Sequence, residues 1–274
     1  MTFVHPSASV HPSSCVEPGA LLGADVEIGP FCHVGAEAKL GPGVKLLSHV
    51  VVAGATEIGA RTRIFPFASI GHEPQDLKYR GEPTQLKIGV DCLIREGVTI
   101  NPGTEGGGGE TIVGDDCAFL ANSHVGHDCR LGRGVILSNN VMLAGHCRVE
   151  DFAIFGGGAA AHQFARIGAH AFVGGLTGVT DDLIPYGVAI GNRAKLGGIN
   201  VVGMKRRGFA AEEIQAVRRA YRQLFAAQGA LKARVEQVAQ DFAGVEAVQQ
   251  IVAFLREGGD RAVTIPRERG EEAA

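Results

Sequence analysis

Residues 22–45 read LGADVE IGPFCH VGAEAK LGPGVK, four consecutive groups of six that each begin with a large aliphatic residue. The second residue of every group is glycine, and the fifth is small or moderately apolar (Val26, Cys32, Ala38 and Val44). A fixed internal period of this kind indicates stacked units, each too small to fold alone.

The same period extends through most of the chain. The phase holds over residues 4–70 and 88–100, slips by one residue (113 − 100 is 13, not 12), and holds again over 113–179. Two segments interrupt it, at 71–87 and 101–110. We expect both to be loops that project from a rigid stack, which is where function usually resides.

A six-residue period contains the alternation of a strand, because residues i, i+2 and i+4 share one face. Each hexad therefore fits a short strand with one large and one small inward side chain, followed by a bend that glycine makes easier. Three hexads would close one coil of a three-sided prism, and coils would stack about 4.8 Å apart. The period does not decide the hand of the coil, since the general preference of parallel crossovers is right-handed.

Composition supports a thin solenoid and excludes some functions. The chain of 274 residues has 40 glycines, no tryptophan and a net charge of −3, which argues against general nucleic-acid binding. We find no N-terminal basic-then-apolar signal and no apolar run near the ~20 residues of a transmembrane segment, so a cytoplasmic location is expected. Five of the six cysteines occupy the small inward position and are expected to be packing thiols.

The chain divides into four expected segments. These are a prism at residues 1–190, a connecting segment at 191–208, an α-helical domain at 209–260 and a charged, disordered tail at 261–274. Helices that follow a solenoid can cap its last coil, which would otherwise expose an open sheet edge.

Histidines converge in this register. Positions 125, 143 and 161 are 18 apart, and His124, His127, His146 and His162 all lie within three residues of them. Four of the ten histidines would then gather along one edge, within roughly 10 Å. They are compatible with solvated histidines at a subunit contact, with a Zn²⁺ site, or with a general base in a substrate cleft.

Five motifs narrow the function. They are QDLKY-x-GEPT at 75–84, NSHVGHDC at 122–129, AGH at 144–146, AHQF at 161–164 and MKRRGF at 204–209. In this order they resemble the UDP-N-acetylglucosamine O-acyltransferase family of hexapeptide-repeat enzymes, over nearly the whole chain. The resemblance implies a mainly β fold, a left-handed parallel β-helix with a C-terminal α-helical domain, in a homotrimer with active sites between subunits.

The resemblance also implies a reaction. Family members transfer a (3R)-3-hydroxyacyl group from acyl carrier protein to the glucosamine 3-hydroxyl of UDP-N-acetylglucosamine, the first step of lipid A biosynthesis, and need no metal or cofactor. His127 matches the general base, Asp128 could hold its imidazole, and the backbone N–H of Gly145 matches the oxyanion-hole donor. The substrate-contacting positions are matched by Gln75, Asp76, Lys78, His124, His146, His162 and Gln163.

Further positions come from the same resemblance. Gly175 matches the residue that limits acyl length, and an open glycine there favours a long chain near 3-hydroxymyristoyl. The nucleotide-binding positions, which the neighbouring subunit contributes, are matched by Asn200, Arg206 and Arg207, whose forks suit a diphosphate. A basic cluster at Arg218, Arg219 and Arg222 could receive the acidic carrier protein.

Alternatives stay open at this point. The chain has Asn-Pro-Gly-Thr at 101–104 where the family often has His-Arg-Gly-Thr, and Val202 replaces a common acidic residue. These departures leave open N-acylation of a 3-amino UDP-sugar. A metal-dependent trimer similar to the gamma-type carbonic anhydrases, or a trimeric scaffold without activity, would use the same fold.

Overall fold

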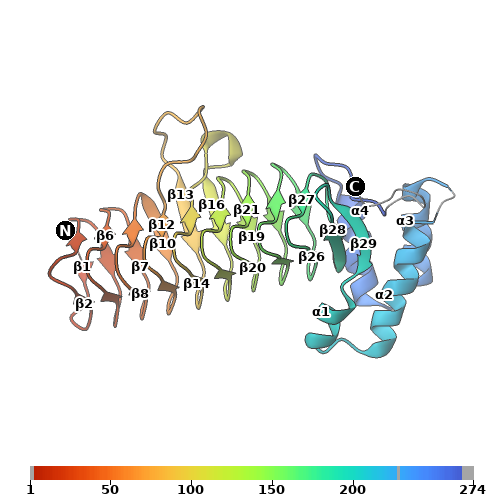
Figure 1. Cartoon of the computed structure of the whole chain (residues 1–274), viewed down its shortest axis with the longest axis horizontal. Coiled ribbons are helices and arrows are strands. Elements are labelled where there is room, and N and C mark those ends of the chain that lie inside the picture. The colour runs from red at the N-terminus through yellow and green to blue at the C-terminus, as the bar shows by residue number, and fades with distance from the viewer. Residues whose placement is uncertain (1–2, 227–228, 267–274) are drawn as a thin grey trace.

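The computed structural model describes residues 3–226 and 229–266. In these residues short strands form three sheets along an elongated stack, and the helices gather at its C-terminal end (Figure 1). The first sheet contains β1 (Phe3–Val4), β4 (Leu21–Leu22), β7 (Lys39–Leu40), β10 (Ala55–Ile58), β13 (Gln85–Ile88), β16 (Glu110–Val113), β19 (Arg130–Leu131), β22 (Arg148–Val149) and β25 (Arg166–Ile167).

The other two sheets follow the same order along the chain. The second contains β2 (Ser9–Val10), β5 (Glu27–Ile28), β8 (Lys45–Leu46), β11 (Arg63–Ile64), β14 (Leu93–Ile94), β17 (Ala118–Phe119), β20 (Ile136–Leu137), β23 (Ile154–Phe155), β26 (Phe172–Val173), β28 (Gly187–Ile190) and β29 (Lys195–Ile199). The third contains β3 (Cys15–Val16), β6 (His33–Val34), β9 (Val51–Val52), β12 (Ser69–Ile70), β15 (Thr99–Ile100), β18 (His124–Val125), β21 (Met142–Leu143), β24 (Ala160–Ala161) and β27 (Gly178–Val179).

The predicted stacking register is confirmed. Leu131 pairs with Val149, 18 residues later, in parallel strands of one sheet. Pairs that span the interruptions are further apart: Ile58 with Ile88 (88 − 58 = 30) and Ile88 with Val113 (113 − 88 = 25). The two insertions therefore add 12 and 7 residues to a coil of 18, and the strands stay in phase across both.

The core lies inside the prism. The first and fifth residues of successive hexads are buried, for example Ile94 and Val98, and burial of such aliphatic side chains contributes roughly 25 cal/mol per Å² of apolar surface. The five cysteines expected to be packing thiols are buried and unpaired: Cys32, Cys92, Cys117, Cys129 and Cys147.

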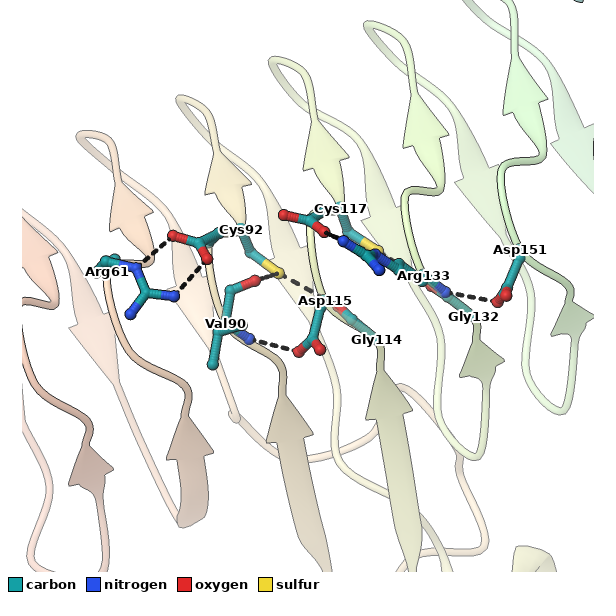
Figure 2. A network of polar contacts seen from close by, with 11 residues as sticks. Arg61, Val90, Cys92, Gly114, Asp115, Cys117, Gly132, Arg133 and Asp151 are labelled. Atoms are coloured by element: carbon teal, nitrogen blue, oxygen red, sulfur yellow. Dashed lines mark hydrogen bonds and ion pairs between the residues drawn. The ribbon is translucent and has the colours of Figure 1, made fainter. Parts of the chain in front are cut away.

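Side chains tie one coil to the next at the corner between the first and second sheets (Figure 2). Asp115 Oδ1 accepts a hydrogen bond from the backbone N–H of Val90 at 2.8 Å, and Asp151 Oδ1 accepts one from Arg133 at 2.8 Å. These carboxylates satisfy backbone donors that the turns would otherwise leave unpaired, so they fix the vertical register on which the site depends.

The two insertions project from the same side of the stack, between β12 and β13 and between β15 and β16 (Figure 1). They also support each other, because the Asn101 amide Nδ2 donates to the carbonyls of His72 and Glu73, at 3.1 Å each. The second insertion includes a single 3₁₀ turn, η1 (Glu105–Gly107).

The chain covers its own last coil. The antiparallel pair β28 and β29 extends the second sheet, and α1 (Val201–Arg206), α2 (Ala211–Leu224), α3 (Leu231–Asp241) and α4 (Glu246–Glu257) follow. The expectation that helices alone cap the prism was therefore incomplete, because the hairpin pairs with the sheet edge first and α2 contacts β29 from behind. None of the helices in the described ranges has the length and hydropathy to cross a bilayer.

The expected disordered tail does not begin at residue 261. Val263 forms a parallel bridge with Asp182, and the buried Thr264 donates its N–H to the Asp182 carbonyl at 2.8 Å. Leu196 N–H also donates to the carbonyl of Ile265 at 2.9 Å. The charged composition concealed a short extended segment whose backbone pairs with the end of the stack. The rest of that tail, 267–274, lies outside the described residues.

Candidate active site

The candidate site lies at the corner between the third and first sheets, where the chain turns from β18, β21 and β24 toward β19, β22 and β25. Because successive coils are 18 residues apart, one turn position is shared by His127, Gly145 and Gln163. The next position is shared by Asp128, His146 and Phe164, with left-handed φ values of 59°, 60° and 67°.

His127 and Asp128 form a buried hydrogen-bonded pair. His127 Nδ1 lies 2.8 Å from Asp128 Oδ2, and their side chains are 9% and 1% exposed. An ionised carboxylate only accepts, so Nδ1 carries a proton and Nε2 of the neutral ring keeps its lone pair. Asp128 also accepts from Thr104, whose N–H lies 2.8 Å from Oδ1 and whose hydroxyl lies 2.6 Å from Oδ2.

Two glycines lie against this pair. A Cβ on Gly145 would be 2.5 Å from Cε1 and 2.6 Å from Nε2 of His127, and a Cβ on Gly107 would be 1.9 Å from Cγ of Asp128. Neither position has room for a side chain. The N–H of Gly145 has no hydrogen-bond acceptor among the described residues, so it is available to a ligand beside the imidazole.

A groove of about 720 Å³ runs beside His127 along the third sheet. Its floor is apolar, formed by Met142, Leu143, Ala144, Ala160, Ala161 and Val179. The expected site residues in its lining are Gln75, His124, His127, Gly145, His162 and Gln163. An apolar floor with a few convergent polar groups suits a ligand that combines a hydrocarbon portion with a polar end.

Two groove histidines have fixed partners. Thr99 Oγ1 lies 2.7 Å from His124 Nδ1, and burial lowers the pKa of His124. Arg261 Nη2 lies 2.6 Å from His162 Nδ1. A guanidinium only donates, so Nδ1 of His162 accepts and its Nε2 carries the proton of the neutral ring. Both histidines therefore present their Nε2 side to other groups.

His146 lies on the far side of Asp128 instead of in the groove. Its ring stacks on Phe164 with centroids 4.5 Å apart and meets the His127 ring edge-on at 4.9 Å. Burial lowers the pKa of His146, and the Asp128 carboxylate, 3.8 Å from Nδ1, opposes that shift. His146 packs against the catalytic candidate, and it lines the hollow that also contains Asp128.

Asp76, Lys78 and Gly175 do not line the groove within one chain. Asp76 Oδ1 accepts the N–H of Lys78 at 2.9 Å, an Asx turn that shapes the first insertion and leaves Lys78 exposed. Gly175 is exposed at a turn, where its nearest neighbour is the carbonyl of Gly157.

The expected nucleotide-binding residues are also separate from His127 in the single chain. Asn200 caps helix α1, because its Oδ1 accepts the N–H of Gly203 at 2.9 Å. The Arg207 guanidinium lies 3.7 Å from the ring centroid of Phe152, and Arg206 is exposed. None of the three lines the groove that contains His127.

The arrangement does not favour the Zn²⁺ alternative. Among the described residues, the group that could hold a metal ion is His127, Asp128 and His146, with ligand atoms within 4.8 Å of one another. The Asp128 oxygens already accept three hydrogen bonds from Thr104 and His127, and His124 and His162 bond elsewhere. The geometry is that of an oriented imidazole, not of three imidazoles aimed at one point.

Sequence reasoning missed three of these residues as members of the site: Thr99, Thr104 and Arg261. Thr99 precedes the hexad residue Ile100 and could have been found by the same arithmetic that places His124 beside it. Thr104 and Arg261 lie outside the periodic segments, so no register could place them.

Known proteins resemble this chain along its length. Residues 110–145 match the family model for six repeats of the bacterial transferase hexapeptide, and residues 182–264 match domain 2 of UDP N-acetylglucosamine O-acyltransferase. The acyl-[acyl-carrier-protein]–UDP-N-acetylglucosamine O-acyltransferase of Rhizobium johnstonii is 50% identical over 99% of this chain and 100% of its own. That of Methylobacterium radiotolerans is 65% identical over 75% of this chain and 76% of its own.

Solved structures agree. The UDP-N-acetylglucosamine acyltransferase from Campylobacter jejuni aligns with a TM-score of 0.89 and 36% identity, covering 94% of this chain and 100% of that one. With the parallel stacking of the three sheets, these matches show a left-handed parallel β-helix, the hand that the hexad period alone could not decide.

Proposed function

The chain belongs to the UDP-N-acetylglucosamine O-acyltransferase family, and from that membership we propose that it transfers an acyl group from acyl carrier protein to UDP-N-acetylglucosamine with His127 as the general base. The acyl group is a (3R)-3-hydroxyacyl chain and the acceptor is the glucosamine 3-hydroxyl. The product is the first intermediate of lipid A biosynthesis.

The observation that carries this proposal is the His127–Asp128 pair beside the groove. With Nδ1–H bonded to Asp128, the Nε2 lone pair can accept the proton of the sugar hydroxyl. The sugar oxygen then forms its bond to the thioester carbonyl carbon. When the tetrahedral intermediate collapses, the carbon–sulfur bond breaks and the imidazolium returns the proton to the departing thiolate.

The oxyanion of that intermediate needs a donor close to His127. Gly145 is suited to this role because its N–H lacks an acceptor within the described ranges and its missing side chain leaves the imidazole and the backbone adjacent. A preorganised backbone donor of this kind contributes about 10²–10³-fold to turnover in other acyl-transfer enzymes.

The groove divides the substrate by polarity. The apolar floor at Leu143 and Ala161 suits the acyl chain, while Gln75, His124 and His162 offer polar contacts to the sugar. An Nε2–H on His162, fixed by Arg261, is a donor for a hydroxyl or carbonyl oxygen.

A homotrimer completes this proposal. Asn200, Arg206 and Arg207 lie away from the groove of their own chain, so a neighbouring subunit must supply their counterparts if they hold the diphosphate. Asp76 and Lys78, on a loop that projects from the stack, would approach the substrate in the same assembly (Figure 1). Gly175 would then face the end of the acyl chain.

An acyl-transfer assay with His127→Ala tests the proposal. Purified protein is incubated with UDP-N-acetylglucosamine and a panel of 3-hydroxyacyl carrier proteins, and the 3-amino sugar is run in parallel to identify the acceptor. We expect turnover on the 3-hydroxyl sugar and a loss of about 10³-fold or more in the variant, with trimer mass and thermal unfolding unchanged. Full activity of His127→Ala would remove that residue from the base role.

A further inference from the structure

The second insertion of the prism reaches behind the His127–Asp128 pair. It adds seven residues to the coil between Ile88 and Val113, which is one more than a whole hexad (25 − 18 = 7). An insertion that breaks the register by one residue has no value for stacking. Its contacts at Asp128 therefore call for a separate explanation.

Thr104 is the residue of this insertion that touches Asp128. It is buried, its N–H lies 2.8 Å from Asp128 Oδ1, and its hydroxyl lies 2.6 Å from Oδ2. Oδ2 is also the atom bonded to His127 Nδ1. One residue thus donates to both oxygens of the carboxylate that orients the imidazole.

The loop around Thr104 is shaped to hold it there. The Thr104 carbonyl accepts the N–H groups of Gly107 and Gly109, at 3.0 and 2.9 Å, and the N–H of Gly103 donates to Gln85 at 3.2 Å. Gly107 approaches Asp128 so closely that a Cβ would lie 1.9–2.3 Å from its three carboxylate atoms. The glycine run closes over the carboxylate, whose side chain is 1% exposed.

We propose that Thr104 is a positioning residue for the acyl-transfer reaction, acting through Asp128 on His127. An aspartate carboxylate held by one imidazole can rotate about its Cβ–Cγ bond. Two donors from one rigid residue remove that rotation and keep Oδ2 directed at Nδ1–H. The lone pair of Nε2 is then directed into the groove. This inference rests on the proposed function, in which His127 is the base.

Thr104→Val separates this role from simple loop anchoring. Valine keeps the shape and the backbone N–H but removes the hydroxyl donor to Oδ2. We expect kcat to fall about tenfold to hundredfold while the KM for the sugar nucleotide changes less than about twofold, because the hydroxyl does not touch substrate. Thr104→Ser keeps the donor and should stay within about threefold of wild type.

Thr111→Val is the matched control. Thr111 follows the same loop on β16 and is fully buried, and its hydroxyl has no hydrogen-bond partner in residues 3–226 and 229–266. It should keep wild-type kcat. A second pair tests the loop: Gly107→Ala should lower kcat, and Gly106→Ala, whose Cβ meets nothing within 4 Å, should not.

A spectroscopic measurement tests positioning without turnover. In wild-type protein with ¹⁵N-labelled histidine, the proton on His127 Nδ1 should give a downfield resonance, assigned by its absence in His127→Gln. Thr104→Val should shift or broaden it, and Thr104→Ser and Thr111→Val should leave it unchanged. Wild-type kcat in Thr104→Val, or an equal loss in Thr111→Val, overturns the inference. If wild-type protein transfers no acyl group, the proposed function fails and the resonance alone decides whether Thr104 positions His127.

Discussion

Gly145→Ala is the substitution that most directly tests the geometry of His127. The added methyl group would point at the imidazole, 2.5 Å from Cε1 and 2.6 Å from Nε2. The backbone N–H of residue 145, the proposed oxyanion donor, is kept. Gly145 does not adopt a positive φ, so alanine should not strain the backbone. The variant therefore changes the position of the base and leaves the oxyanion donor in place.

The magnitude follows from the contact distance. Carbon atoms pack at about 3.5 Å, so the ring of His127 must move by about 1 Å. It cannot do so and keep its 2.8 Å bond to Asp128, which Thr104 and Gly107 hold in place. A misplacement of about 1 Å at a reacting group costs about 10²-fold in rate, or about 2.7 kcal/mol in the activation free energy.

The assay compares kcat for acyl transfer in Gly145→Ala, Gly35→Ala and wild type. Gly35 follows an apolar hexad residue as many of the glycines do, but its Cβ would have its nearest neighbours at 3.4 and 3.6 Å, which is ordinary contact. We expect about 1% of wild-type turnover in Gly145→Ala, nearly full turnover in Gly35→Ala, and similar thermal unfolding in all three. Turnover of Gly145→Ala within about threefold of wild type would refute the inferred position of the catalytic imidazole.

Three further predictions concern chain length, acid stability and the C-terminal segment. Gly175→Met should shift the preference of the enzyme toward shorter acyl chains, measured with a panel of acyl carrier proteins; an unchanged preference would contradict the role of Gly175. Burial, aided by the charge of Arg207, lowers the pKa of His170. Its unfolded value is about 6.5, so its contribution to stability is complete above that pH and is lost as the pH falls below it; His170→Gln should flatten the decline in thermal stability from pH ~7.5 to ~5.5. Arg261→Ala should raise the KM for the sugar nucleotide severalfold with little change in kcat, because it frees the His162 tautomer, and equal kinetics would exclude that contact from substrate binding.

The periodic part of the fold could be predicted because its cause is local and repeated. Each hexad buries one large and one small side chain, so the positions of Val125, Leu143 and Ala161 follow from counting, and with them the alignment of His127 above Gly145. The hand of the coil could not be predicted in this way. Both hands bury the same residues, and the general rule for parallel crossovers favours the opposite hand.

The direction of side chains at the corner was harder to predict. Counting placed His146 one residue after Gly145 but did not show that its left-handed turn position directs the ring toward Phe164 and Asp128, away from the groove. Arg261 was assigned to a disordered tail because the composition there is charged. Its segment is ordered by backbone pairing with Asp182, which composition does not report.

The site thus combines two kinds of sequence with different physical constraints. The hexads supply its position, since His127 and the apolar floor of the groove belong to consecutive coils whose core packing fixes them. The aperiodic insertions supply its orientation, since one contributes Gln75 to the groove and the other contributes Thr104 to Asp128. An insertion contributes little apolar burial, so it can change without loss of the stack, whereas a change in a hexad alters the core. Substitutions in the insertions should therefore alter kcat more than stability, and those at inward hexad positions should do the reverse.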